Sequence, residues 1–175
     1  MDKENIISLK YVNKSNNFEP SFADEGSSGF DLRAWITPDN GGSVVKRTNE
    51  ETQKEYETCC VVLKPLERKM IHTGLYFDVP EYAEIQIRPR SGLSLKKGLS
   101  LVNCIGTIDS SYTGECCALV INLSNEDVII ENGERIVQAV LSPVYNGHYV
   151  RLHKIADLEK QTKRGDGGFG HSGTK

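Results

Sequence analysis

The clearest structural signal in the chain is the segment Val128-Ile129-Ile130-Glu131-Asn132-Gly133-Glu134-Arg135-Ile136-Val137-Gln138-Ala139-Val140-Leu141. Two apolar runs flank the dipeptide Asn132-Gly133. Short runs that are rich in Val and Ile are typical of β-strands. Asn-Gly suits a type I′ turn, because both central residues of that turn take a positive φ. The segment therefore predicts two strands joined by a tight hairpin.

Further strands are predicted on both sides of this segment. Glu84-Ile85-Gln86-Ile87-Arg88 alternates strictly between polar and apolar residues, as a half-buried strand does. Cys116 to Leu123 and Cys60 to Leu63 are short apolar runs, and Asn146-Gly147 marks a second turn before Tyr149 to Leu152. Many short strands separated by Gly and Asn predict an all-β fold, a sandwich or a barrel.

Helix is expected only as short turns, at Ser91 to Lys97 and at Ile155 to Lys160. The polar stretch from Thr37 to Thr58 is expected to be a long surface loop or an extended hairpin. No repeat and no βαβ pattern is present. We therefore expect a single domain over residues 1–160, followed by a C-terminal arm over 161–175.

Length and charge narrow the class of protein. A chain of 175 residues can bury a real core. A net charge of -3 argues against a nucleic-acid partner, which would favour a basic surface. No apolar run approaches a membrane span, so no membrane partner is expected. The start, MDKENIISLKYVNK, is too polar for a secretory signal, which predicts a cytoplasmic location.

The five cysteines do not suggest a cross-linked or metal-bound fold. Their number is odd, two pairs are adjacent in sequence, and no CxxC motif occurs, which makes both a disulfide framework and a zinc site poor explanations. We expect them to be free thiols in strands. A catalytic cysteine is a weaker alternative. The residues are Cys59, Cys60, Cys104, Cys116 and Cys117.

Two clusters in the first half of the chain could carry chemistry. Ser28 to Ala34 places Asp31 in a short apolar strand, where it is either an ordinary outward carboxylate or one held at a fixed place for a metal. Arg88 to Leu93 contains Ser91 at the start of the expected helical turn. Its hydroxyl, the N–H groups there and the neighbouring arginine could form an anion cradle, or Ser91 could be a simple helix cap.

Two further clusters lie in the second half. Asn103 to Glu115 carries Asp109 and Tyr112 three residues apart. Asp109 could be a general base and Tyr112 a ring against a sugar, or Asp109 could simply bond to its own turn. The fourth cluster is Gly133 to Gln138. Its Arg135 and Gln138 are at odd and even positions, so a regular strand would point their side chains to opposite faces.

The C-terminal segment Arg164-Gly165-Asp166-Gly167-Gly168-Phe169-Gly170-His171-Ser172-Gly173 is half glycine. Glycine loses more backbone freedom on ordering than any other residue, so this stretch is expected to be flexible. It nevertheless carries an arginine, an aromatic ring and a hydroxyl, which suit a phosphate and a base. It is either a frayed terminus or an arm that closes over a nucleotide.

Taken together and in this order, the five clusters resemble the five motifs of the trimeric dUTP pyrophosphatases (dUTPases). The resemblance runs from about residue 5 to the C-terminus. Each motif is weak alone, but all five occur in order and with suitable spacing. The stretch from Thr37 to Thr58 departs from the family pattern because it is longer, and it lies between the first two motifs.

The resemblance implies Mg²⁺-dependent hydrolysis of dUTP to dUMP and pyrophosphate, which limits uracil in DNA and supplies dUMP for thymidylate synthesis. It implies that Asp109 is the general base for the attacking water and that Gln138 contacts the α-phosphate or that water. Asp31 would contact the Mg²⁺ ion through water. Arg135 would brace the third-motif loop, which is the loop of the third cluster, Asn103 to Glu115. The residues implied to bind substrate are Arg90, Ser91, Gly92, Asn103, Gly106, Ile108, Tyr112, Arg164, Phe169, Gly170 and Ser172.

The resemblance also assigns parts of the substrate. Asn103 would read the uracil edge and Tyr112 would stack under the deoxyribose. Phe169 would cover the uracil ring, and Arg164 and Ser172 would hold the γ-phosphate. The implied fold is a jelly-roll-like β barrel in a homotrimer whose active sites are shared between chains.

Two other functions remain open at this point. A dCTP deaminase-like enzyme has the same fold, and Glu115 is the candidate for the acid/base residue that deamination needs. A non-catalytic nucleotide-binding module could instead signal to partners through the Thr37 to Thr58 stretch. The intact arm, Asp109 and Tyr112 favour the dUTPase interpretation over both.

Overall fold

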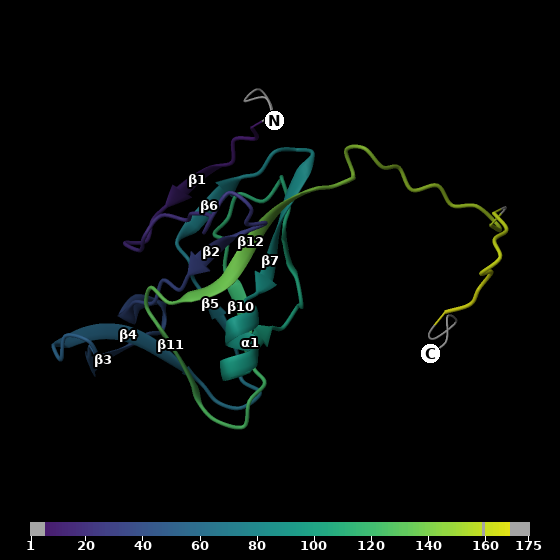
Figure 1. The fold of residues 1–175 in the computed structure, drawn as a ribbon. Helices are drawn as coiled ribbons and strands as arrows, with labels where there is room; N and C mark the ends of the chain where they lie inside the picture. Colours follow the sequence, from purple (N-terminus) through teal and green to yellow (C-terminus); the bar gives the residue numbers. More distant parts are fainter. Residues whose placement is uncertain (1–5, 159, 169–175) are drawn as a thin grey trace. The chain divides into compact units, whose positions relative to one another are not determined.

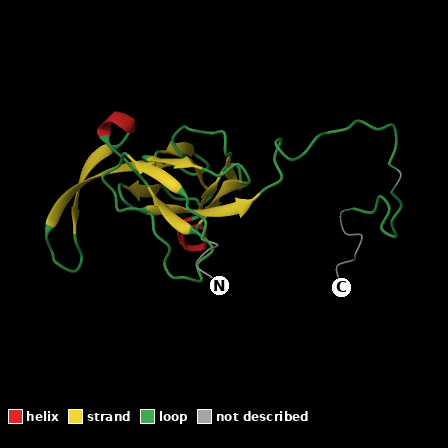
Figure 2. Cartoon of the chain, turned by 90° about the horizontal axis from the view of Figure 1, so that it is seen from above, coloured by secondary structure: helices red, strands yellow, loops and turns green. Residues whose placement is uncertain are grey.

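The computed structural model describes residues 6–158 and 160–168. The chain divides into two units, Met1–Tyr145 and Asn146–Lys175, and the structure describes residues 6–145 of the first and residues 146–158 and 160–168 of the second. The first unit contains all the strands of the described residues and the one α-helix found there. The prediction of an all-β fold is confirmed, because strands make up most of the regular structure (Figure 2).

Twelve strands of the described chain form four antiparallel sheets (Figure 1). In spatial order the sheets contain β1 (Lys10–Asn13) and β6 (Leu75–Asp78); β5 (Arg68–Ile71), β10 (Ala118–Asn122) and β8 (Leu99–Leu101); β11 (Val128–Glu131), β4 (Glu55–Leu63) and β3 (Ser43–Thr48); and β2 (Phe30–Arg33), β12 (Arg135–Pro143), β7 (Ala83–Pro89) and β9 (Gly106–Ile108). Several short sheets that share one core are consistent with a jelly-roll-like arrangement.

The core is formed by the inward side chains of these sheets. Leu32 of β2, Ile85 and Ile87 of β7, and Val137 of β12 are each at most 2% exposed. Burying side chains of this size stabilises the fold by about 1.5–3 kcal/mol each. Alternate residues of β2 and β7 are buried and half-buried, so the opposite face of this sheet carries the polar side chains.

The segment around Asn132-Gly133 is a turn, but the predicted hairpin is wrong. β11 pairs with β4, whereas β12 pairs with β2 and β7, so the two flanking strands lie in different sheets. Gly133 has a φ of 82° and Asn132 has no positive φ, which excludes a type I′ turn. The chain beyond β2 holds this turn: Ile36 N–H donates to Asn132 Oδ1 at 2.9 Å, and Gly133 N–H donates to Ala34 O at 2.8 Å.

Strands β3 and β4 form a long antiparallel hairpin within and beyond the Thr37 to Thr58 stretch. Their register runs from Ser43 opposite Cys60 to Thr48 opposite Glu55. A short 3-10 helix, Pro38–Asn40, precedes the hairpin. Arg47 of β3 reaches across to β11, where its Nε lies 2.7 Å from Glu131 Oε1, and this ion pair ties the hairpin to the rest of the sheet.

The helical predictions have two outcomes. Helix α1 (Ser91–Lys97) forms where it was predicted and ends at Gly98, whose φ of 65° suits glycine. No helix forms at 155–158 or at residue 160, and 149–152 is not a strand, since Tyr149 and Val150 N–H groups turn back to Asn146 O. This segment lies in the second unit and pairs with no strand of the described chain.

None of the helices in the described residues combines the length and the apolar character of a membrane crossing.

A prediction concerns Gly29, which lies just before β2 and against β12. A Cβ atom at this position would lie 2.7 Å from Ala139 O and 2.9 Å from Val140 Cγ2. Gly29→Ala should therefore push β2 away from β12 and lower the free energy of unfolding by about 1–3 kcal/mol, measured by urea denaturation. Gly26→Ala is the matched control, because its Cβ would meet nothing closer than 3.4 Å. Equal urea midpoints for Gly29→Ala and the native chain would contradict this account.

Candidate functional site

An aspartate flanked by two arginines lies at the polar face of the β2–β12–β7 sheet. Asp31 is half-buried between its buried neighbours in β2, Phe30 and Leu32. Its Oδ1 lies 2.9 Å from Arg90 Nε, and its Oδ2 lies 3.1 Å from Arg135 Nη1. Arg90 also donates to the Arg135 carbonyl at 3.0 Å. Two guanidinium groups on one carboxylate leave a net positive charge, which suits an anion such as a phosphate.

A β-bulge brings Arg135 and Gln138 to the same side of the sheet. The pairing of β12 with β2 shifts register between Arg135 and Val137, and both Ile136 and Val137 are buried. Because the extra residue changes the alternation, Gln138 lies opposite Asp31, the residue that Arg135 contacts. The expectation that these two side chains face opposite ways is therefore wrong, since it assumed a regular strand.

The start of α1 adjoins this cluster. Gln138 Nε2 donates to Pro89 O at 3.1 Å, just before Arg90, Ser91 and Gly92. Arg90 is the N-cap residue and makes no side-chain cap bond, so Ser91 is the first helical residue and not the cap. Ser91 and Gly92 are exposed, and a Cβ on Gly92 would meet no atom within 4 Å. Packing does not require glycine at position 92 in the single chain.

The third-motif loop follows β9 and presents a free carboxylate. Asp109 is exposed, and within the described part of the chain its side chain has no hydrogen-bond or ion-pair partner; only its carbonyl is used, by Tyr112 N–H at 3.0 Å. Tyr112 donates from its hydroxyl to Glu115 O at 2.9 Å, which folds the ring back over the loop. A Cβ on Gly114 would lie 2.5 Å from that hydroxyl, so a larger residue there would displace the Tyr112 ring from this position.

Asn103, Gly106 and Ile108 form the base of the same loop. Gly106 and Ile108 are the ends of β9 and pair with Ile87 and Ile85 of β7. A Cβ on Gly106 would lie 3.2 Å from Ile87 Cβ and 3.4 Å from Asn103 Nδ2, so its absence lets Asn103 pack closely. The loop is thereby attached firmly to the central sheet.

The two parts of the predicted site are far apart within one chain. Gln138 lies opposite Arg88, near one end of β7, whereas Ile108 lies opposite Ile85, near its other end. β2 and β9 are also separated by two strands, β12 and β7. Strand spacing and rise place Asp31 and Asp109 roughly 20 Å from each other. The structure therefore gathers Asp31, the start of α1 and Gln138, but it does not bring Asp109 to them.

The arm residues are only partly described. Arg164 lies in a turn, where its Nε donates to Gly167 O at 2.7 Å and Gly165 has a φ of 55°. Phe169, Gly170 and Ser172 lie outside the described residues. Because the arm belongs to the second unit, its predicted role at the site stays a prediction.

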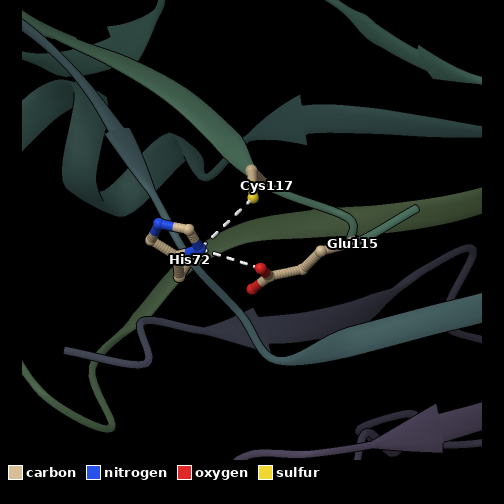
Figure 3. Close-up of side chains that lie close together, drawn as sticks. All are labelled: His72, Glu115 and Cys117. Atoms are coloured by element: carbon tan, nitrogen blue, oxygen red, sulfur yellow. Dashed lines mark hydrogen bonds and ion pairs between the residues drawn. The ribbon is translucent and has the colours of Figure 1, made fainter. Parts of the chain in front are cut away.

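One cluster was missed by sequence reasoning: His72, Glu115 and Cys117 lie side by side (Figure 3). His72 Nδ1 is 2.8 Å from Glu115 Oε2 and 3.7 Å from Cys117 Sγ. Glu115 Oε1 accepts the backbone N–H groups of Thr73 at 3.0 Å and Gly74 at 2.8 Å. His72 is 43 residues from Glu115, so no local spacing could have signalled the contact.

The chemistry of this cluster is set by burial and hydrogen bonding. Burial has the largest effect on Glu115 and opposes its ionisation, but the hydrogen bonds from His72, Gly74 and Thr73 outweigh it and lower its pKa. Burial raises the pKa of Cys117 to about 12, and the neighbouring Glu115 adds to this. Burial likewise raises the pKa of Cys116 to about 12. Neither cysteine is a thiolate nucleophile in this environment.

The position of Glu115 bears on the deaminase alternative. Both of its carboxylate oxygens are used, by His72 and by the backbone of Thr73 and Gly74. The carboxylate is thus bound to the segment His72 to Gly74, which directly follows β5. This position gives no support to a role as an acid/base residue beside a nucleotide base.

Comparison with known proteins identifies the family. The family model described as dUTPase matches residues 56–173. The deoxyuridine 5'-triphosphate nucleotidohydrolase of Finegoldia magna is 44% identical over 167 residues, which cover 95% of this chain and 99% of that protein. The deoxyuridine 5'-triphosphate nucleotidohydrolase of Cytophaga hutchinsonii is 39% identical over 174 residues, which cover 99% of this chain and 97% of that protein.

Solved structures show the same fold. A mutant dUTPase of Staphylococcus bacteriophage 80alpha with dUpNHpp superimposes with a TM-score of 0.74 at 22% identity, covering 95% of this chain and 98% of that one. A mutant dUTPase from phage phi11 of S. aureus, in which a structural Mg(II) ion is coordinated, superimposes with a TM-score of 0.68 at 18% identity, covering 88% of this chain and 100% of that one. With the family model matching most of its length and a relative 44% identical along nearly the whole of both sequences, the chain belongs to the dUTPase family.

Proposed function

We propose that this protein hydrolyses dUTP to dUMP and pyrophosphate, which limits uracil in DNA and supplies dUMP for thymidylate synthesis. The observation that carries the proposal is Asp109: an exposed carboxylate without a side-chain partner in the described residues, on a loop that also presents Tyr112. Family membership gives the substrate class, since the relatives in Finegoldia magna and Cytophaga hutchinsonii are deoxyuridine triphosphate nucleotidohydrolases.

Asp109 acts as the general base. A carboxylate is ionised at neutral pH and can accept the proton of a water molecule. The oxygen of that water forms a bond to the α-phosphorus while the bond from the α-phosphorus to the bridging oxygen breaks. Pyrophosphate leaves, and the water proton passes to Asp109. Most of the rate enhancement in such an in-line displacement comes from positioning and charge stabilisation.

The cluster at the start of α1 receives the phosphates. Arg90 and the exposed Ser91 and Gly92 offer cationic, hydroxyl and backbone donors, and Gln138 contacts the α-phosphate or the attacking water. The open space around Gly92 admits a phosphate without a clash. In our proposal Arg135 braces the third-motif loop of a neighbouring copy, in addition to its observed contact with Asp31 in its own chain.

The residues present fit Mg²⁺ in an indirect way. Both oxygens of Asp31 already face arginines, at 2.9 Å and 3.1 Å, so Asp31 would hold the ion through its water shell. That suits magnesium, which dehydrates reluctantly and binds largely to substrate phosphates. When bound, the ion would neutralise part of the negative charge on the triphosphate.

Specificity rests on the loop and the arm. Asn103 reads the uracil edge, Tyr112 stacks under the deoxyribose, and Gly106 and Ile108 set the wall of the pocket. Arg164 and Ser172 hold the γ-phosphate, while Phe169 and Gly170 cover the base. Cytoplasmic location and the lack of nucleic-acid or membrane partners stay predictions from composition and the N-terminal sequence.

Complete sites require more than one chain. Asp109 and the Asp31–Arg90–Gln138 cluster lie roughly 20 Å apart, too far to act on one α-phosphate. A ring of three copies would place the Asp109 loop of one chain against the phosphate cluster of the next, and three-fold symmetry would repeat that site identically. We therefore propose a homotrimer with shared active sites.

The first prediction for this function concerns the base. Asp109→Asn should lower dUTP turnover by about 10²–10⁴-fold and keep dUTP binding, because the amide preserves shape and cannot accept the proton. Pyrophosphate release would be measured with dUTP, dCTP, dTTP and UTP, with dUTP strongly preferred in the native protein. Asp127→Asn, at another exposed aspartate, is the control. Near-normal turnover by Asp109→Asn would refute the base assignment, and ammonia release from dCTP would favour the deaminase alternative.

The second prediction concerns site sharing. An Asp109→Asn chain and a chain carrying both Arg90→Ala and Gln138→Ala should each be almost inactive alone. Co-expressed with different affinity tags and purified as mixed oligomers, they should recover about a third of the native activity per site, because each mixed ring of three has one interface in three that joins an intact Asp109 to an intact phosphate cluster. Activity no greater than the sum of the two separate variants would mean that each site belongs to a single chain.

The third prediction concerns the arm. Deleting residues 164–175 should lower turnover at least tenfold, because the arm closes the site and excludes water. The melting temperature should stay unchanged, because every buried apolar residue found in the described chain lies in the first unit. Deletion of residues 174 and 175 alone is the control and should keep full activity. Unchanged turnover after the longer deletion would remove the arm from the mechanism.

A further inference from the structure

We propose that His72, Glu115 and Cys117 form a second metal site, one that takes a thiophilic divalent ion of the Zn²⁺ class. An imidazole nitrogen, a carboxylate oxygen and a thiol sulfur converge here, and all three donor atoms lie within 4.8 Å of one another (Figure 3). This combination of nitrogen, oxygen and sulfur donors is typical of zinc sites, which use Cys, His and Asp or Glu. It does not suit Mg²⁺, which prefers oxygen ligands.

The nitrogen–sulfur separation is close to that of tetrahedral coordination, and the nitrogen–oxygen separation is shorter. Zinc bonds of about 2.0 Å to nitrogen, 2.1 Å to oxygen and 2.3 Å to sulfur correspond to edges of about 3.5 Å for N···S and about 3.3 Å for N···O. The observed distance from His72 Nδ1 to Cys117 Sγ is 3.7 Å. The distance from His72 Nδ1 to Glu115 Oε2 is 2.8 Å, as expected for a hydrogen bond that an ion would open by about half an ångström.

The donors are held in place before any ion arrives. Glu115 Oε1 accepts two backbone N–H groups, from Thr73 and Gly74, which leaves Oε2 directed at His72. The His72 carbonyl accepts Trp35 N–H at 2.7 Å, and Thr73 Oγ1 donates to Cys116 O at 2.5 Å. Hydrogen bonds of this kind orient metal ligands and strengthen binding.

The site is partly open to solvent. The His72 side chain is 27% exposed and that of Glu115 is 15% exposed, so an ion can enter without unfolding the chain. A water molecule would complete the coordination. Cysteine binds zinc as the thiolate, so its proton is released to solvent when the ion binds.

An ion here would cross-link two paired strands just beyond the end of their ladder, at the pair Ile71 and Ala118. His72 directly follows β5, and Cys117 directly precedes β10. Glu115 also accepts the Tyr112 hydroxyl through its carbonyl, so the ion would lie at the base of the loop that carries Asp109 and Tyr112. The bound ion would stabilise this loop, and binding does not depend on dUTP hydrolysis.

The test is titration of the full-length, chelator-treated and reduced protein with Co²⁺ in the absence of nucleotide. Cobalt bound to a thiolate gives a near-ultraviolet charge-transfer absorption that identifies the sulfur ligand. We expect one ion per chain, displacement of the cobalt by Zn²⁺, and a melting temperature that rises with Zn²⁺ concentration, because an ion that binds only the folded state stabilises it by mass action.

Variants separate this site from other thiols and from the Mg²⁺ site. Cys117→Ser should abolish the charge-transfer band, and His72→Ala should weaken cobalt binding at least tenfold, with circular dichroism verifying that each variant folds. Cys104→Ser, at an exposed cysteine, and Asp31→Asn, at the proposed Mg²⁺ site, should leave the cobalt spectrum unchanged. Absence of the band in the native protein would overturn the proposal, as would a band that survives Cys117→Ser or is lost in Cys104→Ser.

Discussion

The pairing of β12 with β2 on one side and with β7 on the other organises both the core and the candidate site. Its inward residues, Val137 among them, complete the core of the first unit. Its outward residue Gln138 lies between Asp31 and Arg88 in register. A single bulge turns Arg135 to the same side, where it contacts Asp31. Without that extra residue, the arginine and the glutamine would face opposite ways.

The sheet that assembles the phosphate cluster also keeps the proposed base away from it. β9 pairs with the far end of β7, so the Asp109 loop emerges at a distance from Asp31 and α1. The shortness of β9, three residues, leaves most of the third motif as a loop that can present Asp109 outward. In our proposal each chain carries two half-sites and gains a complete site only by association, which couples catalysis to oligomerisation.

The His72, Glu115 and Cys117 cluster shows how the loop is supported. Glu115 closes the turn at Thr73 and Gly74 with its side chain and positions Tyr112 with its carbonyl. One residue thus links the end of β5, the start of β10 and the proposed sugar-stacking ring. The side chains of His72, Glu115 and Cys117 are also the ligands of the proposed zinc-class ion. Supporting the loop and binding the ion are compatible, because the hydrogen bonds that support the loop also hold the ligand atoms close together.

The sequence alone was sufficient for the all-β class, for helix α1 and for the family, since these depend on local alternation, on a short helical run and on five motifs in order. Tertiary contacts were needed for the rest. Asn132-Gly133 signalled a turn correctly, but which strands pair across it depends on distant partners such as Ala34 and Ile36. The bulge in β12 and the meeting of His72 with Glu115, 43 residues apart, likewise have no local signal. Propensity and spacing act over a few residues, whereas strand partners and side-chain clusters are selected by the packing of the whole chain.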